Sequence, residues 1–204
     1  MIRLDVPDAI IRGRVIAIAR RVPPSRLIDV AGIISDVGIA ALEVTLDSDD
    51  ALASIEQLAG GGLMIGAGTV RSVADAVMAA NAGAQFIVMP HTDAEIVRSI
   101  TARGVPVMPG ALTPTEAVTA WDVGASAVKL FPAMLGGPDY LKALRGPLSD
   151  IAFVPTGGID DSNARMYLDA GAVAVGVGGW LTGSDDLALV SERAASLARI
   201  TQSV

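Results

Sequence analysis

The sequence predicts an α/β fold, specifically a (β/α)8 barrel, and two observations lead to this prediction. Short apolar runs alternate with segments that carry helix-start signals, at a spacing of roughly 20 residues or twice that. Half of the 204 residues are hydrophobic and only 3% are aromatic, which is typical of parallel strands that are covered on both faces. Eight regular units favour a closed barrel over a doubly wound open sheet, which is the alternative. Without a linker or charge block, this length predicts one domain over residues 1–204.

A repeated glycine marks the expected junctions between helices and strands. Gly38, Gly83, Gly124 and Gly171 each stand between a helix-like segment and an apolar run, and Gly104 stands in a looser copy of the same pattern. A glycine at this place predicts a helix that ends in the left-handed backbone conformation.

The elements follow from these junctions. A short helix is expected near residues 7–12, before the first strand, where it could close the far end of the barrel. We expect strands at residues 15–18, 41–46, 63–67, 85–88, 105–108, 125–130, 151–154 and 173–177. Residues 113–116 and 92–95 both match a capping box, and Ser25 is the expected N-cap of the first long helix.

Composition excludes several classes of function. The net charge of −7 and the lack of a Lys/Arg cluster argue against a nucleic-acid partner. The chain has no cysteine and one histidine, His91, so it can form no disulfide, thiolate zinc site or His-rich metal site, although an Asp/Glu magnesium site stays open. The apolar runs are shorter than the roughly 20 residues of a membrane span. Residues 1–5 lack the apolar core of a signal peptide, so we expect a cytoplasmic protein without a membrane partner.

Lys129 lies in the middle of a nearly all-apolar run, and the only other lysine in the chain is Lys142. Loss of hydration in a buried strand disfavours the charged form of a lysine and leaves it partly neutral and nucleophilic. Such a lysine is suited to imine formation with a carbonyl substrate. The alternative is a lysine at a strand end that reaches solvent along its stem.

Glu43 is the second charged residue inside an apolar strand. Because strand side chains alternate, Glu43, Thr45 and Asp47 share one face of the strand. A buried carboxylate is costly unless it is paired or protonated, so Glu43 and Lys129 are expected to pair inside the barrel. This pair has a catalytic interpretation, with Glu43 as the proton carrier, and a purely structural one.

The chemistry of such a barrel lies at the carboxyl ends of its strands. The last two strands end in Thr156-Gly157-Gly158 and in Gly178-Gly179, and glycine-rich strand ends at this place often hold a phosphate. The other strand ends contribute the substrate-binding candidates Arg20, Thr69, Pro90 and Phe131.

Several segments, in the same order and at the same spacing, make the chain similar to a known family. They are LEVTL (42–46), GAGTV (66–70), FIVMP (86–90), PG (109–110), VKLFPA (128–133) and PTGGI (155–159). In these segments the chain resembles the 2-keto-3-deoxy-6-phosphogluconate/4-hydroxy-2-oxoglutarate aldolase family over nearly its whole length. The KxFPA and PTGGI segments are specific when they occur together.

The resemblance implies a class I aldolase of Entner-Doudoroff-type carbohydrate metabolism, usually a homotrimer, which needs no metal or other cofactor. It would cleave a 2-keto-3-deoxy sugar acid of the 6-phosphogluconate or 6-phosphogalactonate type, or 4-hydroxy-2-oxoglutarate, to pyruvate and an aldehyde. By resemblance, Lys129 forms the imine with pyruvate or the keto acid and Glu43 moves protons. Arg20 and Thr69 hold the substrate, and the Thr-Gly-Gly and terminal glycine loops bind the phosphate.

Two positions depart from the family pattern. Many members carry arginine, and phosphogalactonate-type members tend to carry asparagine, where this chain has Asp47. Gly179 stands where a serine is common, so a hydroxyl donor to phosphate is missing. Both changes leave the imine chemistry in place but affect how the sugar acid and its phosphate are bound.

Two other functions fit the same barrel. One is a phosphosugar isomerase or epimerase in which Glu43 is the base and Lys129 only an electrostatic partner. The other is a ligand-binding barrel that has kept the pocket and lost turnover. Fold alone does not separate these; trapping of an imine on the lysine, and turnover, would.

Overall fold

The structure of the chain is a computed structural model that describes residues 3–202. Residues 1–2 and 203–204 lie outside the described part. The stretch 1–5 and the expected domain 1–204 are therefore described only in part.

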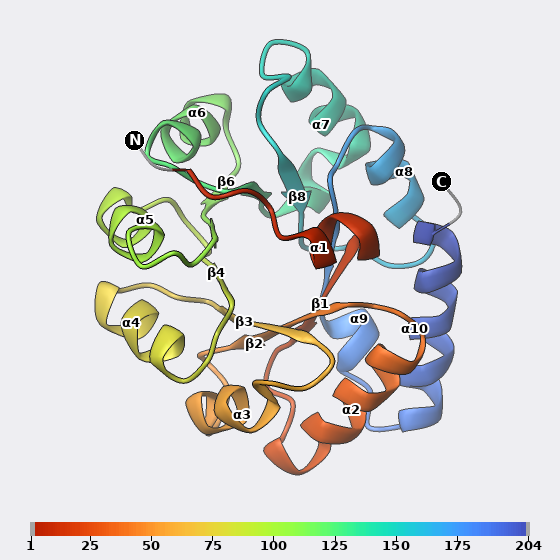
Figure 1. Cartoon of the computed structure of the whole chain (residues 1–204). Coiled ribbons are helices and arrows are strands. Elements are labelled where there is room, and N and C mark those ends of the chain that lie inside the picture. The colour runs from red at the N-terminus through yellow and green to blue at the C-terminus, as the bar shows by residue number, and fades with distance from the viewer. Residues whose placement is uncertain (1–2, 203–204) are drawn as a thin grey trace.

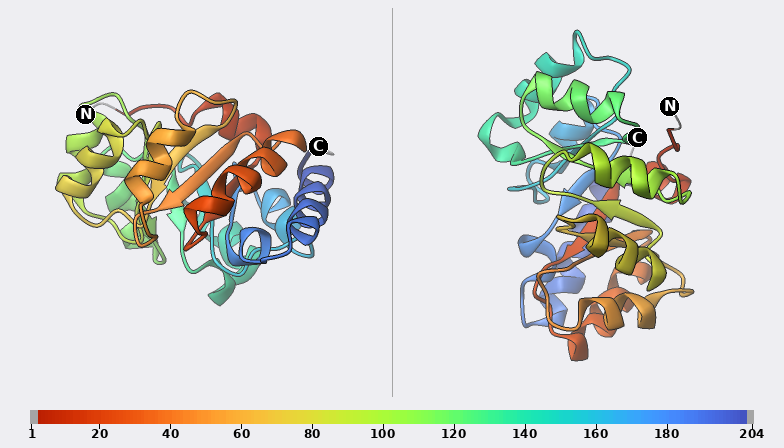
Figure 2. Two further views of the ribbon diagram at one scale, coloured as in Figure 1. Left: turned by 90° about the horizontal axis from the view of Figure 1, so that it is seen from below. Right: turned by 90° about the vertical axis from the view of Figure 1, so that its left-hand side faces the viewer.

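Within residues 3–202, nine short strands form two parallel sheets. The larger sheet has the order β5-β4-β3-β2-β1-β9, and the smaller has the order β6-β7-β8. The strands are β1 (Val15–Ala19), β2 (Ala41–Thr45), β3 (Met64–Gly68), β4 (Phe86–Val88), β5 (Val107–Met108), β6 (Gly110–Ala111), β7 (Val128–Leu130), β8 (Phe153–Pro155) and β9 (Val175–Val177). The fold is therefore α/β with a curled parallel sheet, as Figures 1 and 2 show.

Backbone hydrogen bonds also run between the two sheets. On one side, Ser126 N–H donates to the Val107 carbonyl at 2.9 Å, and on the other, Val173 N–H donates to the Phe153 carbonyl at 3.0 Å. A single parallel bridge joins Thr156 to Gly176. The edges of the smaller sheet thus contact the edges of the larger one.

The helices lie around the outside of the strands, with α1 near the centre of the face seen in Figure 1. They are α1 (Asp8–Gly13), α2 (Pro24–Asp36), α3 (Ala51–Leu58), α4 (Val73–Asn81), α5 (Ala94–Thr101), α6 (Pro114–Asp122), the 3-10 turn η1 (Ala133–Leu135), α7 (Gly137–Arg145), α8 (Ala164–Asp169), α9 (Gly179–Thr182) and α10 (Leu187–Gln202). The expected short helix before the first strand is confirmed as α1.

The expected fifth strand, residues 105–108, is shorter in the structure, and a further two-residue strand follows it after Pro109. Pro109 separates β5 from β6, because proline has no N–H to donate to a neighbouring strand. Its carbonyl still accepts from Lys129 N–H at 2.9 Å. As a result, β5 belongs to the larger sheet and β6 to the smaller one.

The glycine pattern is confirmed at each of the five junctions. Gly38, Gly83, Gly104, Gly124 and Gly171 have φ values of 85°, 103°, 78°, 106° and 98°, all in the left-handed region that favours glycine.

The predicted helix caps are confirmed in one case and wrong in two. Thr113 forms a full capping box with Glu116 at the start of α6. The cap of α5 is Asp93 rather than Thr92, whose hydroxyl donates instead to the Gly110 carbonyl at 3.0 Å. Ser25 lies inside α2, which begins at Pro24 without a side-chain cap, because proline needs no partner for a missing N–H.

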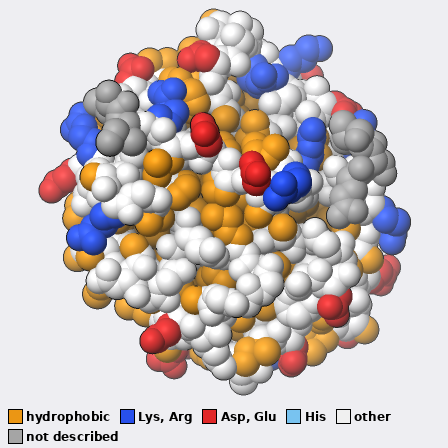
Figure 3. Space-filling view, viewed as in Figure 1, with side chains coloured by type: hydrophobic (Ala, Val, Ile, Leu, Met, Phe, Trp, Pro, Cys, Tyr) orange, Lys and Arg blue, Asp and Glu red, His pale blue; other side chains and the backbone are white. Residues whose placement is uncertain are grey.

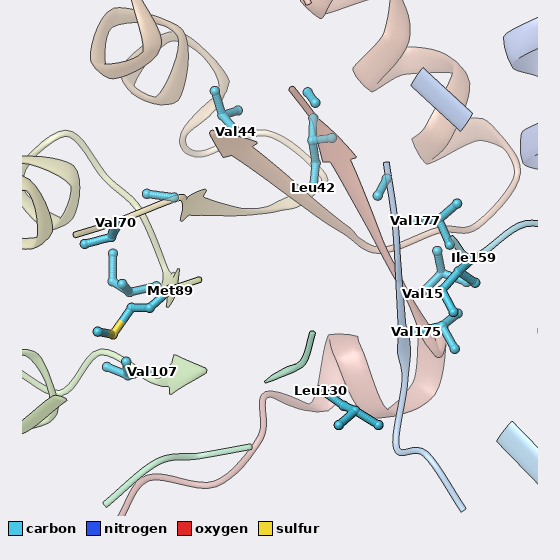
Figure 4. Packing of buried hydrophobic residues seen from close by; sticks show 14 of the residues in the cluster. Val15, Leu42, Val44, Val70, Met89, Val107, Leu130, Ile159, Val175 and Val177 are labelled. Carbon is cyan, nitrogen blue, oxygen red and sulfur yellow. The ribbon is translucent and has the colours of Figure 1, made fainter. Parts of the chain in front are cut away.

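Two hydrophobic clusters lie on opposite faces of the strands. Val15 and Ala17 of β1 belong to the larger cluster beneath the helices, whereas Ile16 between them belongs to a smaller inner cluster. Figure 4 shows Val15 beside Val175 of the neighbouring strand β9. Ile10 of α1 is fully buried in the inner cluster, so α1 covers one end of this cluster.

The surface on the side of α1 carries charges of both signs between apolar side chains (Figure 3). Within residues 3–202, no helix is long and apolar enough to cross a membrane.

Candidate active site

A cavity of about 280 Å³ opens at the carboxyl ends of β1, β7, β8 and β9. Its lining comes from four chain segments, each following or ending one of these strands. The lining residues are Ile18, Arg20, Lys129, Phe131, Thr156, Gly157, Gly158, Ile159, Asp160, Gly176, Gly178, Gly179 and Trp180.

Lys129 reaches this cavity from the middle of β7. Its backbone is paired on both sides, with Gly110 of β6 and Val154 of β8. Its side chain is only 4% exposed, and Nζ lies 5.2 Å from the centre of the Phe131 ring. The alternative of a lysine that extends into solvent is therefore wrong, and the amine is held in an enclosed, partly aromatic environment.

Glu43 lies on the inner face of β2 and is 1% exposed. Its Oε1 has no hydrogen-bond partner among the described residues. Burial raises the pKa of Glu43, and the positive charges of Lys129 and Arg20 oppose this rise without cancelling it. The carboxyl side chain lies over Gly68, where an added Cβ would come within 1.8 Å of Oε1.

The expected ion pair between Glu43 and Lys129 is not formed. In the part of the chain that the structure describes, the ion pairs with a nitrogen-oxygen distance of 4.0 Å or less do not include Glu43. The charge of Lys129 nevertheless acts on the Glu43 carboxyl group and lowers its pKa, against the larger effect of burial.

Arg20, at the end of β1, is held by two partners. One terminal nitrogen donates to Asp47 at 3.0 Å, and the other donates to the Thr69 hydroxyl at 3.1 Å. Asp47 also lies 3.6 Å from the Arg21 guanidinium. Thr69 has a left-handed φ of 58°, which is unusual for a threonine and often marks a functional position.

The glycine loops that follow β8 and β9 form part of the cavity wall. Gly157 and Gly158 have φ values of 97° and 76°, a conformation that L side chains rarely adopt. The Gly157 carbonyl accepts from Met134 N–H at 3.1 Å, while the N–H groups of Gly157 and Gly158 donate to no backbone acceptor in the described part of the chain. These N–H groups are therefore available to a ligand.

Eight of the sequence-predicted residues line the cavity, and three do not. Those that line it are Lys129, Arg20, Phe131, Thr156, Gly157, Gly158, Gly178 and Gly179. Glu43 is buried on β2, and the Thr69 hydroxyl accepts from Arg20. Pro90 packs against Gly110, where an added Cβ would come 2.4 Å from the Pro90 carbonyl.

Sequence reasoning missed Ile18, Ile159 and Asp160 as lining residues. Ile18 and Ile159 carried no signal for a site, since they look like ordinary apolar residues. Gly176 and Trp180 also line the cavity, and they belong to the glycine-rich end of the last strand that the sequence indicated. Arg193 donates to the Trp180 carbonyl at 2.6 Å and lies 5.2 Å from the centre of its ring.

No group of three or more His, Cys, Asp or Glu side chains within residues 3–202 is arranged to hold a metal ion.

Comparison with known proteins identifies the family. The family model "KDPG and KHG aldolase" matches residues 6–201. The 2-dehydro-3-deoxy-6-phosphogalactonate aldolase of Escherichia coli K12 is 38% identical over 167 residues, which cover 80% of this chain and 82% of the relative.

Solved structures give the same result. A structure described as native KDPGal has a TM-score of 0.87 at 35% identity and covers 91% of this chain and 93% of its own. A KDPG aldolase from Legionella pneumophila has a TM-score of 0.81 at 27% identity and covers 96% of both chains. The isomerase alternative finds no support in these comparisons. The chain belongs to the KDPG and KHG aldolase family, whose members are lyases.

Proposed function

We propose that the protein is a class I aldolase that cleaves 2-keto-3-deoxy sugar acids to pyruvate and an aldehyde through an imine on Lys129. The observation that carries the proposal is the position of the Lys129 amine, buried on β7 at the wall of the cavity. The Legionella relative is described with pyruvate captured as a covalent carbinolamine, which is the adduct that precedes an imine.

Lys129 is the nucleophile in this scheme. Its neutral amine adds to the C2 carbonyl of the keto acid, and loss of water gives a protonated imine. The imine withdraws electrons, so the C3–C4 bond breaks as the C4 hydroxyl loses its proton, and the aldehyde leaves. The remaining enamine takes a proton at C3, and hydrolysis of the imine returns the amine and releases pyruvate.

Glu43 is the proposed proton carrier. Its raised pKa brings the carboxyl group closer to the operating pH, where a general base and acid works best. Because Glu43 is not paired with Lys129, a water molecule between the carboxylate and the substrate can relay the proton.

The other predicted residues hold the substrate. Arg20, which lines the same cavity as Lys129, is suited to the keto acid carboxylate, with the Thr69 hydroxyl beside it. Phe131, whose ring centre lies 5.2 Å from Nζ of Lys129, packs along the imine. Pro90 packs against Gly110, the residue of β6 that pairs with Lys129, and so supports the strand that carries the amine. The distal end of the aldehyde half lies against Thr156 and the N–H groups of Gly157, Gly158, Gly178 and Gly179.

We also propose a closed (β/α)8 barrel that forms one domain over residues 1–204. The hydrogen bonds between the two sheets at Ser126 and Val173 support closure, as does the inner hydrophobic cluster that the strands surround. If β5 and β6 are counted as one strand interrupted at Pro109, the described part of the chain has eight strands.

A homotrimer in the cytoplasm is the proposed state of the protein. A structural relative with a TM-score of 0.87 is described as a cage designed by fusing symmetric oligomeric domains. Exposed Met134, Leu135 and Met166 offer apolar surface for such contacts. Sedimentation analysis should give three chains; a monomer at micromolar concentration would contradict the trimer.

Pyruvate release from a 2-keto-3-deoxy sugar acid tests the proposed function. We expect turnover by the wild-type protein, no turnover by Lys129→Met, and no loss of activity with EDTA. Activity in Lys129→Met would contradict the imine mechanism, and loss with EDTA would indicate a metal-dependent lyase. Binding of the acid without release of pyruvate would instead favour a ligand-binding barrel.

A further inference from the structure

The loop after β8 carries three successive backbone N–H groups without a backbone partner. Gly157, Gly158 and Ile159 all line the cavity, and within residues 3–202 their N–H groups donate to no backbone acceptor. Adjacent N–H groups of this kind can bind an anion such as a phosphate without a side-chain cation. Their use to a ligand depends on what fixes their direction.

The carbonyl groups of the loop fix that direction. The peptide bonds of the loop are trans, so each N–H points away from the carbonyl of the preceding residue. The Thr156 carbonyl accepts from Ala133 N–H at 2.9 Å. The Gly157 carbonyl accepts from Met134 N–H at 3.1 Å. These two bonds to η1 therefore orient the N–H groups of Gly157 and Gly158.

A side chain, that of Asn163, performs the same task for the third carbonyl. Its amide nitrogen donates to the Gly158 carbonyl at 2.9 Å, and its amide oxygen accepts from Asp160 N–H at 3.1 Å. One amide group thus binds the peptide groups on both sides of Ile159. By the same geometry, the bond to Gly158 orients the N–H of Ile159.

Asn163 makes these bonds instead of capping α8. It is the N-cap residue of this helix, a position at which an asparagine side chain usually accepts from a backbone N–H of the first turn. It makes no such bond, because its amide is turned back to the loop. The helix gives up a capping interaction that this residue type can supply, and the loop gains two hydrogen bonds.

We propose that Asn163 is a positioning residue that holds the N–H groups of the loop after β8 in place for a phosphate on the aldehyde half of the substrate. The inference rests on the proposed aldolase function. Asn163 lies outside the lining of the cavity, so it acts through Gly158 and Ile159 rather than by touching the substrate.

The test is aldol addition at saturating pyruvate, with either glyceraldehyde or glyceraldehyde 3-phosphate as the varied substrate. Asn163→Ala removes both hydrogen bonds to the loop. Asn163→Ser is too short to replace the bond to the Gly158 carbonyl but can cap α8, so it separates the effect on the loop from the stability of the helix. The matched control is Asn81→Ala, which removes the same amide from an exposed position at the end of α4. The Asp160 carboxylate at the cavity is present in every variant, so its charge does not affect the comparison.

We expect the wild-type KM for glyceraldehyde 3-phosphate to be at least about tenfold below that for glyceraldehyde, because the loop binds the phosphate. In both Asn163 variants the KM for the phosphate should rise by about fivefold to thirtyfold, the effect of weakening a hydrogen bond to a charged group. Their kcat and their KM for glyceraldehyde should stay within about twofold of wild type, as should all constants of Asn81→Ala.

Three results would overturn the inference. They are a wild-type protein without a lower KM for the phosphate, an unchanged KM for the phosphate in folded Asn163→Ser, and an equal rise in KM for both aldehydes. Reductive trapping of pyruvate separates these results from failure of the proposed function. If Lys129 is labelled and the KM for the phosphate does not respond to Asn163, the positioning inference alone is wrong. If Lys129 is not labelled in the folded protein, the aldolase proposal fails and the inference fails with it.

Discussion

Glu43 and Lys129 are both buried, but their charged groups have different surroundings. The carboxyl group is buried without a hydrogen-bond partner on Oε1, whereas the amine lies at the cavity wall beside an aromatic ring. Burial stabilises the neutral form of Glu43, so its protonated state persists to higher pH than that of an ordinary carboxyl group. This difference supports the proposal that Glu43 carries the proton and Lys129 forms the covalent bond.

Glu43→Gln removes the proposed base and keeps the shape of the side chain. Proton exchange at the pyruvate methyl group should slow by about 100-fold or more, while reductive trapping on Lys129 continues. In the wild-type protein the exchange rate should rise with pH through the raised pKa of Glu43, because only the deprotonated group accepts a proton. NMR of pyruvate in deuterated water measures both; wild-type exchange in the variant would require another base.

Gly68 provides a test of the position of Glu43 without changing the carboxyl group. Gly68→Ala places a Cβ within 1.8 Å of Oε1 and must displace the side chain, so exchange should fall while trapping remains. The matched control is Gly32→Ala on α2, where an added Cβ contacts nothing within 4 Å and exchange should be unchanged. Equal effects of the two substitutions would show that Glu43 is not held where we describe it.

At the residue scale, the sequence could identify the acid and the amine but not their separation. Glu43 and Lys129 stand out because each is a charge inside an apolar run. The expected ion pair between Glu43 and Lys129 was wrong. The alternation of side chains along a strand fixes the face that each one occupies, but it does not fix the distance to a side chain on another strand. The Arg20-Asp47-Thr69 contacts join three strand ends that are distant in sequence, and no local pattern encodes them.

At the scale of helices and strands, local sequence predicts the boundaries better than it predicts contacts between distant side chains. The five glycine junctions were predictable because only glycine readily adopts their positive φ. The capping box of Thr113 was predictable because both of its hydrogen bonds lie within four residues of sequence. Thr92 and Ser25 match local cap patterns that tertiary contacts override, and the division at Pro109 depends on which strands lie beside it.

Thr113→Ala tests whether the capping box stabilises α6. Loss of the capping box should lower the free energy of unfolding by about 1 kcal/mol, as measured by urea denaturation. Thr92→Ala removes a hydroxyl that is not the cap of α5 and is the comparison. A larger loss for Thr92→Ala than for Thr113→Ala would contradict the capping assignment.

At the scale of the whole molecule, the inner apolar cluster and the candidate site lie at opposite ends of the strands. The end near α1 is closed by apolar side chains around Ile10, and the opposite end carries the cavity. The fold class was predictable because strand and helix alternation extends over the whole chain. The role of α1 in covering the inner cluster was not encoded in any motif, since it depends on where the strands meet.

Ile10→Ala tests that separation. Truncating this buried side chain should lower the free energy of unfolding by about 2–4 kcal/mol, measured by denaturation, with kcat for pyruvate release unchanged. Ile11, the exposed neighbour, provides the control Ile11→Ala, which should cost much less. A large fall in kcat for a folded Ile10→Ala protein would show that the two ends are coupled.

Borohydride reduction in the presence of pyruvate, followed by intact mass and peptide mapping, tests the central claim most directly. We predict one pyruvate-sized adduct per chain, located on Lys129 and absent from Lys129→Met. An unmodified Lys129 in the folded protein, or an adduct located on Lys142 instead, would contradict the account.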